Sequence, residues 1–230
     1  MIINYRQAVP MVSEFDKDTL LLLHGDLLYD ASMYERSINN DGVSISTNQS
    51  KFGDSSLFFD GSSRLFIPDT INFGVDDFTI EWWEYCTSST VGARFCSSYT
   101  GLYPSDLTTT CGGILIGYNG VHVSASDRLD FGDTWTVIPG LTMMSITTME
   151  WVHWAFVRYG TTLSSYRNGV LFESTPIPGS IHYDTVHPMV IGDYRLYDTD
   201  PFVGYIDEFR ISKVARWTSN FTPPTEPYER

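Results

Sequence analysis

The chain of 230 residues carries a formal net charge of −14 at pH 7, from 28 acidic and 14 basic residues. This balance excludes the basic surface that duplex DNA or an anionic membrane attracts. With 42% hydrophobic and 15% aromatic residues, the chain is not a disordered acidic tail either. A single domain of this length can bury a core without a framework of disulfides.

The first residues, MIINYRQAVPMVSEF, lack the basic stretch and the long apolar stretch of a signal peptide. The longest aliphatic run, residues 20–23, is far too short to span a bilayer. We therefore expect the protein to be made in a host cytoplasm without a signal peptide.

The three cysteines, Cys86, Cys96 and Cys111, are an odd number and no pair has CxxC spacing. This pattern disfavours a structural disulfide set and a metal site. We expect thiols, with a Cys86–Cys96 or a Cys96–Cys111 bridge as the open alternative.

Short runs rich in aliphatic and aromatic residues recur along the chain between clusters of turn residues, and long helical periodicity is absent. Asn119-Gly120 and Asn168-Gly169 predict type I′ hairpin turns, and Gly61-Ser62-Ser63 predicts another tight hairpin. About a dozen strands at intervals of roughly 8–12 residues are typical of an all-β fold, a two-sheet antiparallel β-sandwich or jelly roll. The predicted strands cover residues 19–24, 56–60, 64–67, 78–85, 114–118, 121–125, 152–159, 163–167, 170–174, 189–192 and 205–212.

The two ends of the chain differ from its strand-rich middle. Residues 1–17 have no clear period and predict an N-terminal arm. Prolines 223, 224 and 227 prevent regular ladder pairing, so residues 216–230 predict a Pro-rich C-terminal tail. The sandwich is assigned to residues 18–215, with the Ser-, Thr-, Gly- and Tyr-rich residues 86–113 as a long insertion at its rim.

Four segments resemble a known family in their order and spacing. They are residues 50–61 (SKFGDSSLFFDG), 77–83 (DFTIEWW), 151–158 (WVHWAFVR, with Asn168-Gly169 following) and 204–212 (GYIDEFRIS). Together they resemble laminin-G-like and pentraxin-like domains of the concanavalin A-like lectin/glucanase superfamily. The resemblance implies two curved antiparallel sheets packed face to face, which the strand pattern also predicts.

The chain continues into residues 215–224, ARWTSNFTPP. This ending is similar to laminin-G-like domains found in phage and prophage structural proteins. The similarity implies a phage-type virion accessory protein, such as a capsid decoration, head-fibre or tail-associated protein, and a location in the virion.

Asp207 and Glu208 lie side by side in the last predicted strand. Neighbouring strand residues face opposite sides, so one of the two carboxylates is expected to point inward or to a sheet edge, where it needs a partner. In the resembled family the matching Asp can help to bind a structural calcium ion, which prefers oxygen ligands. The implied calcium site consists of Asp207, backbone oxygens near Gly25 and Gly61, and contributions from Asp26 or Asp60. The alternative is an Asp207 that accepts hydrogen bonds from backbone amides or pairs with an arginine.

Further acidic residues lie in predicted loops: Asp26 and Asp30 after the first strand, and Asp198 and Asp200 near residue 200. No EF-hand pattern accompanies them, so we expect solvated loop charges.

Aromatic side chains in the predicted loops are candidates for stacking on sugar rings. Tyrosines in such loops also make general protein interfaces, which stays the alternative. The candidates are Tyr99, Tyr103, Tyr118, Trp135, Tyr194 and Tyr197.

No catalytic residues are expected. The glucanases of the resembled superfamily carry a Glu-x-Asp-x-x-Glu or similar run, which places the acids on one strand face. This chain has no such run, and Glu81 and Glu84, three apart, should face opposite sides. No nucleophile elbow, zinc-protease motif or phosphate-binding loop is present. His153 shares a strand face with Trp151, and we expect it to pack rather than to catalyse.

The sequence therefore predicts a non-catalytic binding or assembly module without a cofactor, apart from one structural calcium ion if Asp207 binds a metal rather than backbone amides or an arginine. Its expected partners are other virion proteins or its own copies, contacted through the arm and the tail, and cell-surface glycans. Nucleic acid and membrane insertion are not expected. The alternative is a free carbohydrate-binding adhesin, and a remote one is a glycoside hydrolase without the usual acid motif.

Overall fold

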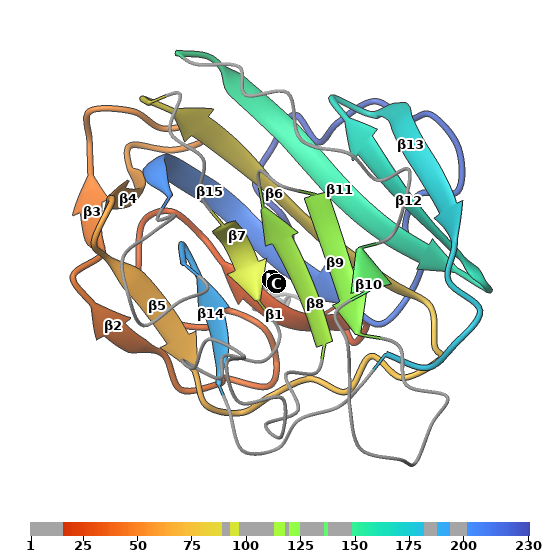
Figure 1. The fold of residues 1–230 in the computed structure, drawn as a ribbon. Coiled ribbons are helices and arrows are strands. Elements are labelled where there is room, and N and C mark those ends of the chain that lie inside the picture. The colour runs from red at the N-terminus through yellow and green to blue at the C-terminus, as the bar shows by residue number, and fades with distance from the viewer. Residues whose placement is uncertain are drawn as a thin grey trace, which may run out of the picture.

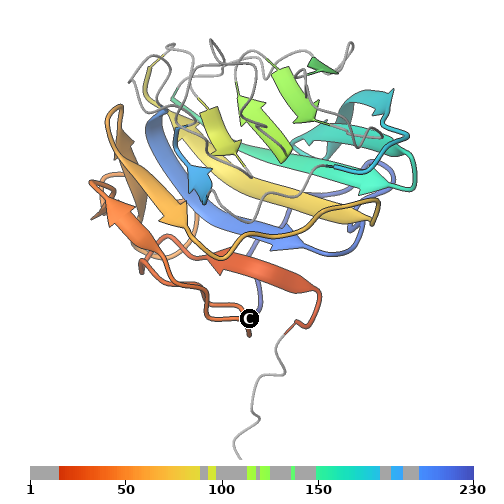
Figure 2. The same ribbon diagram turned by 60° about the horizontal axis from the view of Figure 1, so that its bottom comes forward.

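The computed structural model describes residues 16–88, 93–96, 113–117, 120–124, 136–137, 149–181, 188–193 and 202–230. These residues form two antiparallel sheets packed face to face, which is the predicted β-sandwich (Figure 1). Long curved strands make one layer and shorter strands lie over them as the second layer (Figure 2). This part of the chain contains no helix long and apolar enough to cross a membrane.

Among the described residues the larger sheet has eight strands and contains the longest ones. Its order is β13 (Val170–Pro176), β12 (Thr162–Arg167), β11 (Trp151–Tyr159), β6 (Phe78–Cys86), β15 (Val203–Ser212), β4 (Ser56–Asp60) and β3 (Ser44–Ser46). The eighth strand, β1 (Thr19–Leu23), pairs with the second half of β15, whereas β4 pairs with the first half.

In the part of the chain that the structure describes, the smaller sheet has seven strands. Its order is β10 (Thr136–Val137), β9 (Gly120–Ser124), β8 (Gly113–Gly117), β7 (Ala93–Cys96), β14 (Met189–Ile191), β5 (Arg64–Ile67) and β2 (Asn39–Asp41). The short strands β2, β3, β7 and β10 have no counterpart in the predicted set.

Asn168-Gly169 forms the predicted hairpin turn between β12 and β13. Asn168 and Gly169 have φ angles of 49° and 76°, the left-handed conformation at both positions that a type I′ turn needs. β8 and β9 are paired antiparallel strands, but Gly120 pairs with Gly117 as the first residue of β9, so it is not the turn residue that was predicted.

The Gly61-Ser62-Ser63 turn does not form the predicted hairpin. β4 pairs with β3 and β15 in the eight-stranded sheet, whereas β5 pairs with β2 and β14 in the seven-stranded sheet. Gly61 does adopt a turn conformation, with a φ of 92° that favours glycine. The turn therefore carries the chain from one sheet to the other, and the prediction of a hairpin is wrong.

β6 is buried along all nine of its residues. Ile80 and Trp82 belong to the core between the sheets, where Trp82 stacks on Phe156 and Phe209. Alternation directs Glu81 and Trp83 to the opposite, outer face of the sheet, yet they are 0% and 5% exposed. Another segment must therefore cover this outer face.

The covering segment is residues 216–230, which the sequence separates from the sandwich as a tail. It lies on the side of the eight-stranded sheet away from the seven-stranded sheet (Figure 1). Trp217 and Phe221 pack on a cluster of buried residues of β11 and β12, and Phe221 N donates to Gly169 O at 2.8 Å. Tyr228 is 6% exposed and packs with Leu22. These contacts are all with the segment's own chain.

Candidate functional site

A bulge in β15 brings two acids out of the core. The register with β6 shifts between Asp207 and Arg210, and Glu208 has a φ of 52°. Ile206 and Phe209 both belong to the core although they are three residues apart, which a regular strand does not allow. The expectation that Asp207 and Glu208 face opposite sides is therefore wrong: both avoid the core and each is 2% exposed.

Asp207 joins three segments of the chain through its carboxylate. Oδ1 accepts a hydrogen bond from Gly25 N at 3.1 Å, and Oδ2 accepts from Lys51 N at 2.9 Å and Phe52 N at 3.2 Å. Burial raises the pKa of Asp207 to about 6, against the effect of the Phe52 and Lys51 amides. This arrangement is the alternative considered for Asp207, in which backbone amides are its partners.

The oxygen ligands that a calcium ion needs do not gather at Asp207. Calcium takes about six to eight oxygens. Gly25 presents its N–H to Asp207 rather than its carbonyl, which accepts from the Ser55 hydroxyl at 3.4 Å. Both oxygens of Asp207 already accept hydrogen bonds from backbone N–H groups. A cation bound to this carboxylate would lie close to these partially positive hydrogens, which is unfavourable.

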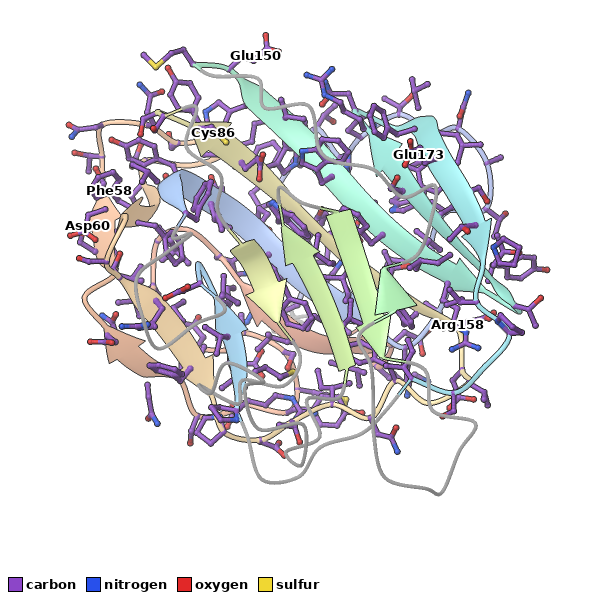
Figure 3. All side chains as sticks on the ribbon, in the orientation of Figure 1. Phe58, Asp60, Cys86, Glu150, Arg158 and Glu173 are labelled. Atoms are coloured by element: carbon purple, nitrogen blue, oxygen red, sulfur yellow. The ribbon has the colours of Figure 1, made fainter. Side chains whose placement is uncertain are left out.

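The remaining residues of the implied calcium site lie elsewhere. Asp60 pairs with Val203, at the end of β4 away from Asp207, and lies at the edge of the molecule with the Gly61 turn (Figure 3). Its Oδ1 accepts from the N–H and the hydroxyl of Ser62. The Asp26 side chain is exposed. No cluster of three or more His, Cys, Asp or Glu side chains suited to a metal occurs in the described ranges, so these residues do not fit a calcium ion at Asp207.

Glu208 links the loop after β1 to the C-terminal segment. Its Oε1 lies 2.7 Å from His24 Nδ1, and its Oε2 accepts from Tyr228 N at 2.8 Å. Burial lowers the pKa of His24, but the hydrogen bond and the charge of Glu208 outweigh it and raise that pKa. Glu208 therefore bonds both the residue that follows β1 and the C-terminal segment.

Glu81 is the centre of a charged network on the outer face. Its Oε1 accepts from Arg210 Nε at 2.9 Å and Nη2 at 2.6 Å, and its Oε2 accepts from Trp217 Nε1 at 2.8 Å. Burial favours the neutral acid, but the charge of Arg210 and further hydrogen bonds lower the pKa of Glu81 to about 2. Glu81 is therefore an ionised structural group.

His153 extends this network as a fully buried side chain, in agreement with the predicted packing role. Its Nε2 lies 3.1 Å from the Tyr228 hydroxyl and 3.5 Å from Glu81 Oε2. The ring of Trp83 packs edge-on against it, and Lys51 Nζ lies 3.7 Å from the Trp83 ring centre. His153 Nδ1 and Trp83 Nε1 are buried without a hydrogen-bond partner.

Asp30 is a further residue that the sequence misplaced. It is 2% exposed rather than solvated, and its carboxylate accepts from the amides of Leu22, Ser32 and Arg36. Short polar side chains that cap their own loop in this way are common, but only the fold shows which amides converge on them. Asp198 and Asp200 lie outside the described residues.

A family model described as the concanavalin A-like lectin/glucanases superfamily matches residues 59–219. The chain belongs to this superfamily. The match confirms the resemblance of the four sequence segments and agrees with the two antiparallel sheets. No curated protein sequence matches the chain.

Several solved structures share the superfamily sandwich at low sequence identity. The binding domain of Paraclostridial Mosquitocidal Protein 1 is 17% identical, with a TM-score of 0.55 over 86% of this chain and 49% of that chain. Domain 4 of AbnA, an extracellular arabinanase from Geobacillus stearothermophilus in complex with arabinotriose, is 15% identical, with a TM-score of 0.55 over 86% and 93%. The botulinum neurotoxin serotype G binding domain is 14% identical, with a TM-score of 0.57 over 86% and 48%. The chain thus spans about half the length of the two toxin domains.

The superfamily's name covers both lectins and glucanases, so the acids on β6 are informative. Glu81 and Glu84 face opposite sides of the sheet, as predicted: Glu81 bonds Trp217 on the outer face, and Glu84 accepts from Trp82 Nε1 at 3.1 Å on the inner face. The buried Cys86, at the end of the same strand, has its Sγ 3.4 Å from Glu84 Oε1 (Figure 3). The predicted sugar-stacking residues all lie outside the described residues, namely Tyr99, Tyr103, Tyr118, Trp135, Tyr194 and Tyr197.

Proposed function

We propose that this chain is a non-catalytic binding module. The observation that carries the proposal is the arrangement of the two acids of β6. A glycosidase needs two carboxyl groups about 5–9.5 Å apart on either side of one glycosidic bond. Glu81 and Glu84 point to opposite faces, both are almost wholly buried, and Glu81 is neutralised by Arg210. Asp207 and Glu208 are likewise buried and bonded within the chain.

Saccharides are the ligand class that we propose for this module. The lectin description of the superfamily and the arabinotriose complex of AbnA domain 4 support this choice. Aromatic rings stack on the apolar faces of sugars, and the six loop aromatics named above supply such rings. Trp135 and Tyr103 are the first two to test, because they come from two separate predicted loops.

A glycan array probed with the intact chain tests the proposal, with reducing-end release measured on the same sugars. We expect binding without hydrolysis, and weaker binding by Trp135→Ala and Tyr103→Ala. Tyr159→Ala is the matched control, because Tyr159 is 62% exposed at the β11–β12 turn. Hydrolysis that is lost in Glu81→Gln or Glu84→Gln would overturn the non-catalytic assignment. Absence of binding to every glycan would overturn the ligand class.

We further propose that the module is an accessory protein of a phage-type particle. The observation that favours this role is the sequence of residues 215–224, which resembles the C-terminal sequences of laminin-G-like domains in phage proteins. Residues 216–230 pack on the sheet of their own chain, so we expect other surfaces of the module to contact neighbouring proteins of the particle. Immunogold electron microscopy of particles from the native source tests the role. Label confined to the particle-free fraction would rule it out and favour a free adhesin.

A further inference from the structure

An exposed apolar surface lies on the connection between β1 and β2. It consists of Leu27, Tyr29, Met33 and Tyr34, which are 41–49% exposed, and we call these four side chains the β1–β2 surface. Single exposed apolar residues are normal on proteins, but four within eight residues are not scattered. Tyrosine and methionine are enriched at protein interfaces.

Asp30 holds this connection in one shape. Its carboxylate accepts from the amides of Leu22, Ser32 and Arg36, each at 2.9 Å, and Ala31 N donates to Leu22 O at 2.8 Å. The connection is therefore fastened to the edge of β1. A surface that is already rigid loses little conformational entropy when a partner binds.

Two arginines support the tyrosines of the surface. Arg36 lies 5.1 Å from the ring centre of Tyr34, and Arg230 lies 5.8 Å from that of Tyr29. Arg36 is fixed in turn by an ion pair with Asp69 and by Leu20 O at 2.9 Å. Arginine beside exposed tyrosine is a frequent composition of the residues that contribute most to protein binding.

The described part of the chain begins at Asp16, beside this surface, and we call the fifteen residues before it, 1–15, the arm from here on. Asp16 N donates to Arg230 O at 2.8 Å, and Arg230 is the residue whose guanidinium lies over Tyr29. Residues 1–15 lie outside the described residues; nine of the fifteen are hydrophobic, and Arg6 and Glu14 are their only charges. Fully extended, fifteen residues reach about 50 Å, enough to cross to a neighbouring molecule.

Net charge favours the arm, rather than another part of the chain, as the segment that binds the β1–β2 surface. The whole chain carries −14 and the arm carries one base and one acid, so residues 16–230 also carry −14. Two such bodies repel each other when they approach directly. A neutral, apolar segment can bury the β1–β2 surface without that repulsion.

We propose that residues 1–15 of a second copy bind the β1–β2 surface, in a reciprocal exchange between two copies. Arg230 stands where Asp16 meets the surface of its own chain, since it bonds Asp16 and its guanidinium lies 5.8 Å from the Tyr29 ring centre. In a pair related by a two-fold axis, each arm meets the surface of the other copy instead. Such a pair displays two binding modules, and its gain in avidity for a glycan-bearing surface rests on the proposed function.

Oxidative footprinting and mass measurement in solution test the exchange. Met33 belongs to the surface, and Met149, 64% exposed and remote in sequence, is the internal reference. We expect the intact chain to form a dimer as its concentration rises and Met33 to oxidise several-fold more slowly than in the monomer. Deletion of residues 1–15 should leave a monomer with fast Met33 oxidation, while Met149 oxidises equally in both. The variant Ile3→Ser/Val9→Ser/Val12→Ser keeps the arm length and should behave like the deletion.

A mixing experiment separates arm exchange from other kinds of pairing. The arm deletion keeps the surface, and Tyr29→Ser/Tyr34→Ser keeps the arm, so each alone should be monomeric and their mixture should form a heterodimer. Val75→Ser, at another site 61% exposed, is the control and should dimerise normally. Met33 protection that is independent of concentration would place the arm on its own chain and overturn the proposal. A dimer that survives the deletion would overturn it too. Glycan binding by the monomeric variants would show that the saccharide proposal stands or falls separately.

Discussion

The indole N–H of Trp217 donates to the Glu81 carboxylate at 2.8 Å, across 136 residues of sequence. This bond fastens the C-terminal segment to the centre of the eight-stranded sheet. We expect Trp217→Phe to lower the free energy of unfolding by about 1–3 kcal/mol, because it keeps an aromatic ring but removes the indole N–H that donates to a buried carboxylate oxygen. Urea denaturation measures the loss. Tyr159→Phe, at a 62% exposed position, is the control and should be close to neutral. Equal stability of both variants would mean that the segment does not cover Glu81 in solution.

The His24–Glu208 pair should make stability depend on pH above neutrality. The folded pKa of His24 is raised above its unfolded value, so protonated His24 contributes stability that is complete below about pH 6.5 and is lost as the pH rises through the folded pKa. We expect the melting temperature of the wild type to fall toward that of His24→Gln as the pH rises above about 6.5.

Asp18→Asn provides the comparison for the His24 variant, since it removes an exposed partner of Lys213 at the opposite end of β1. Its difference from the wild type should be small at every pH, because exposed ion pairs contribute little. A wild-type and a His24→Gln curve that stay parallel would contradict the assignment of the raised pKa to His24.

Gly25 is required by close approach rather than by its backbone conformation. A Cβ at this position would lie 2.5 Å from Asp207 Oδ1 and 2.7 Å from Ser56 Cα. We expect Gly25→Ala to cost about 3 kcal/mol, because the rigid backbone of β4 cannot move away. Gly160→Ala should cost only about 1 kcal/mol, since a Cβ at Gly160 meets nothing within 4 Å and only its φ of 59° is unfavourable. Similar losses in the two variants would contradict this view of Gly25.

Calcium should leave the stability unchanged. Both oxygens of Asp207 already accept amide hydrogens, and Asp60 lies at the other end of β4. We expect no heat when calcium is titrated into EDTA-treated protein, and no rise in melting temperature. A calcium-dependent rise that disappears in Asp207→Asn but persists in Asp60→Asn would show that Asp207 binds the ion after all.

Local patterns predicted the longer strands and the Asn168-Gly169 hairpin turn, because alternation and positive φ angles are properties of a few neighbouring residues. The hairpin predicted at residues 61–63 was wrong because a glycine-serine turn indicates only that the chain bends. The strands that pair with β4 and β5 include partners far away in sequence, which the turn residues do not reveal. The predicted orientation of the Glu208 side chain was wrong because a single inserted residue reverses the alternation of side chains along the strand. The residues that flank the bulge in β15 are of the same types as in any strand, so the sequence does not reveal it.

The candidate site was predicted only in outline. Asp207 was rightly singled out as a carboxylate that needs partners, but its donors are backbone amides, which no side-chain pattern reveals. Glu81 was considered only as a catalytic acid, and its structural role depends on Trp217 and Arg210. A signal was present in the tail, where Trp217, Phe221 and Tyr228 are too apolar for a segment fully surrounded by water.

The hydrogen bond between Asp16 N and Arg230 O closes residues 16–230 almost into a ring. Joining these two positions by a short linker and opening the chain at the exposed residues 47–48 would keep every strand pairing of both sheets. Because Asp16 and Arg230 lie next to each other, the sandwich is also suited to insertion into a surface loop of a host protein. The two linkers to the host would be attached at neighbouring positions of the sandwich. Insertion of residues 16–230 into a host protein is therefore a practical way to display this module.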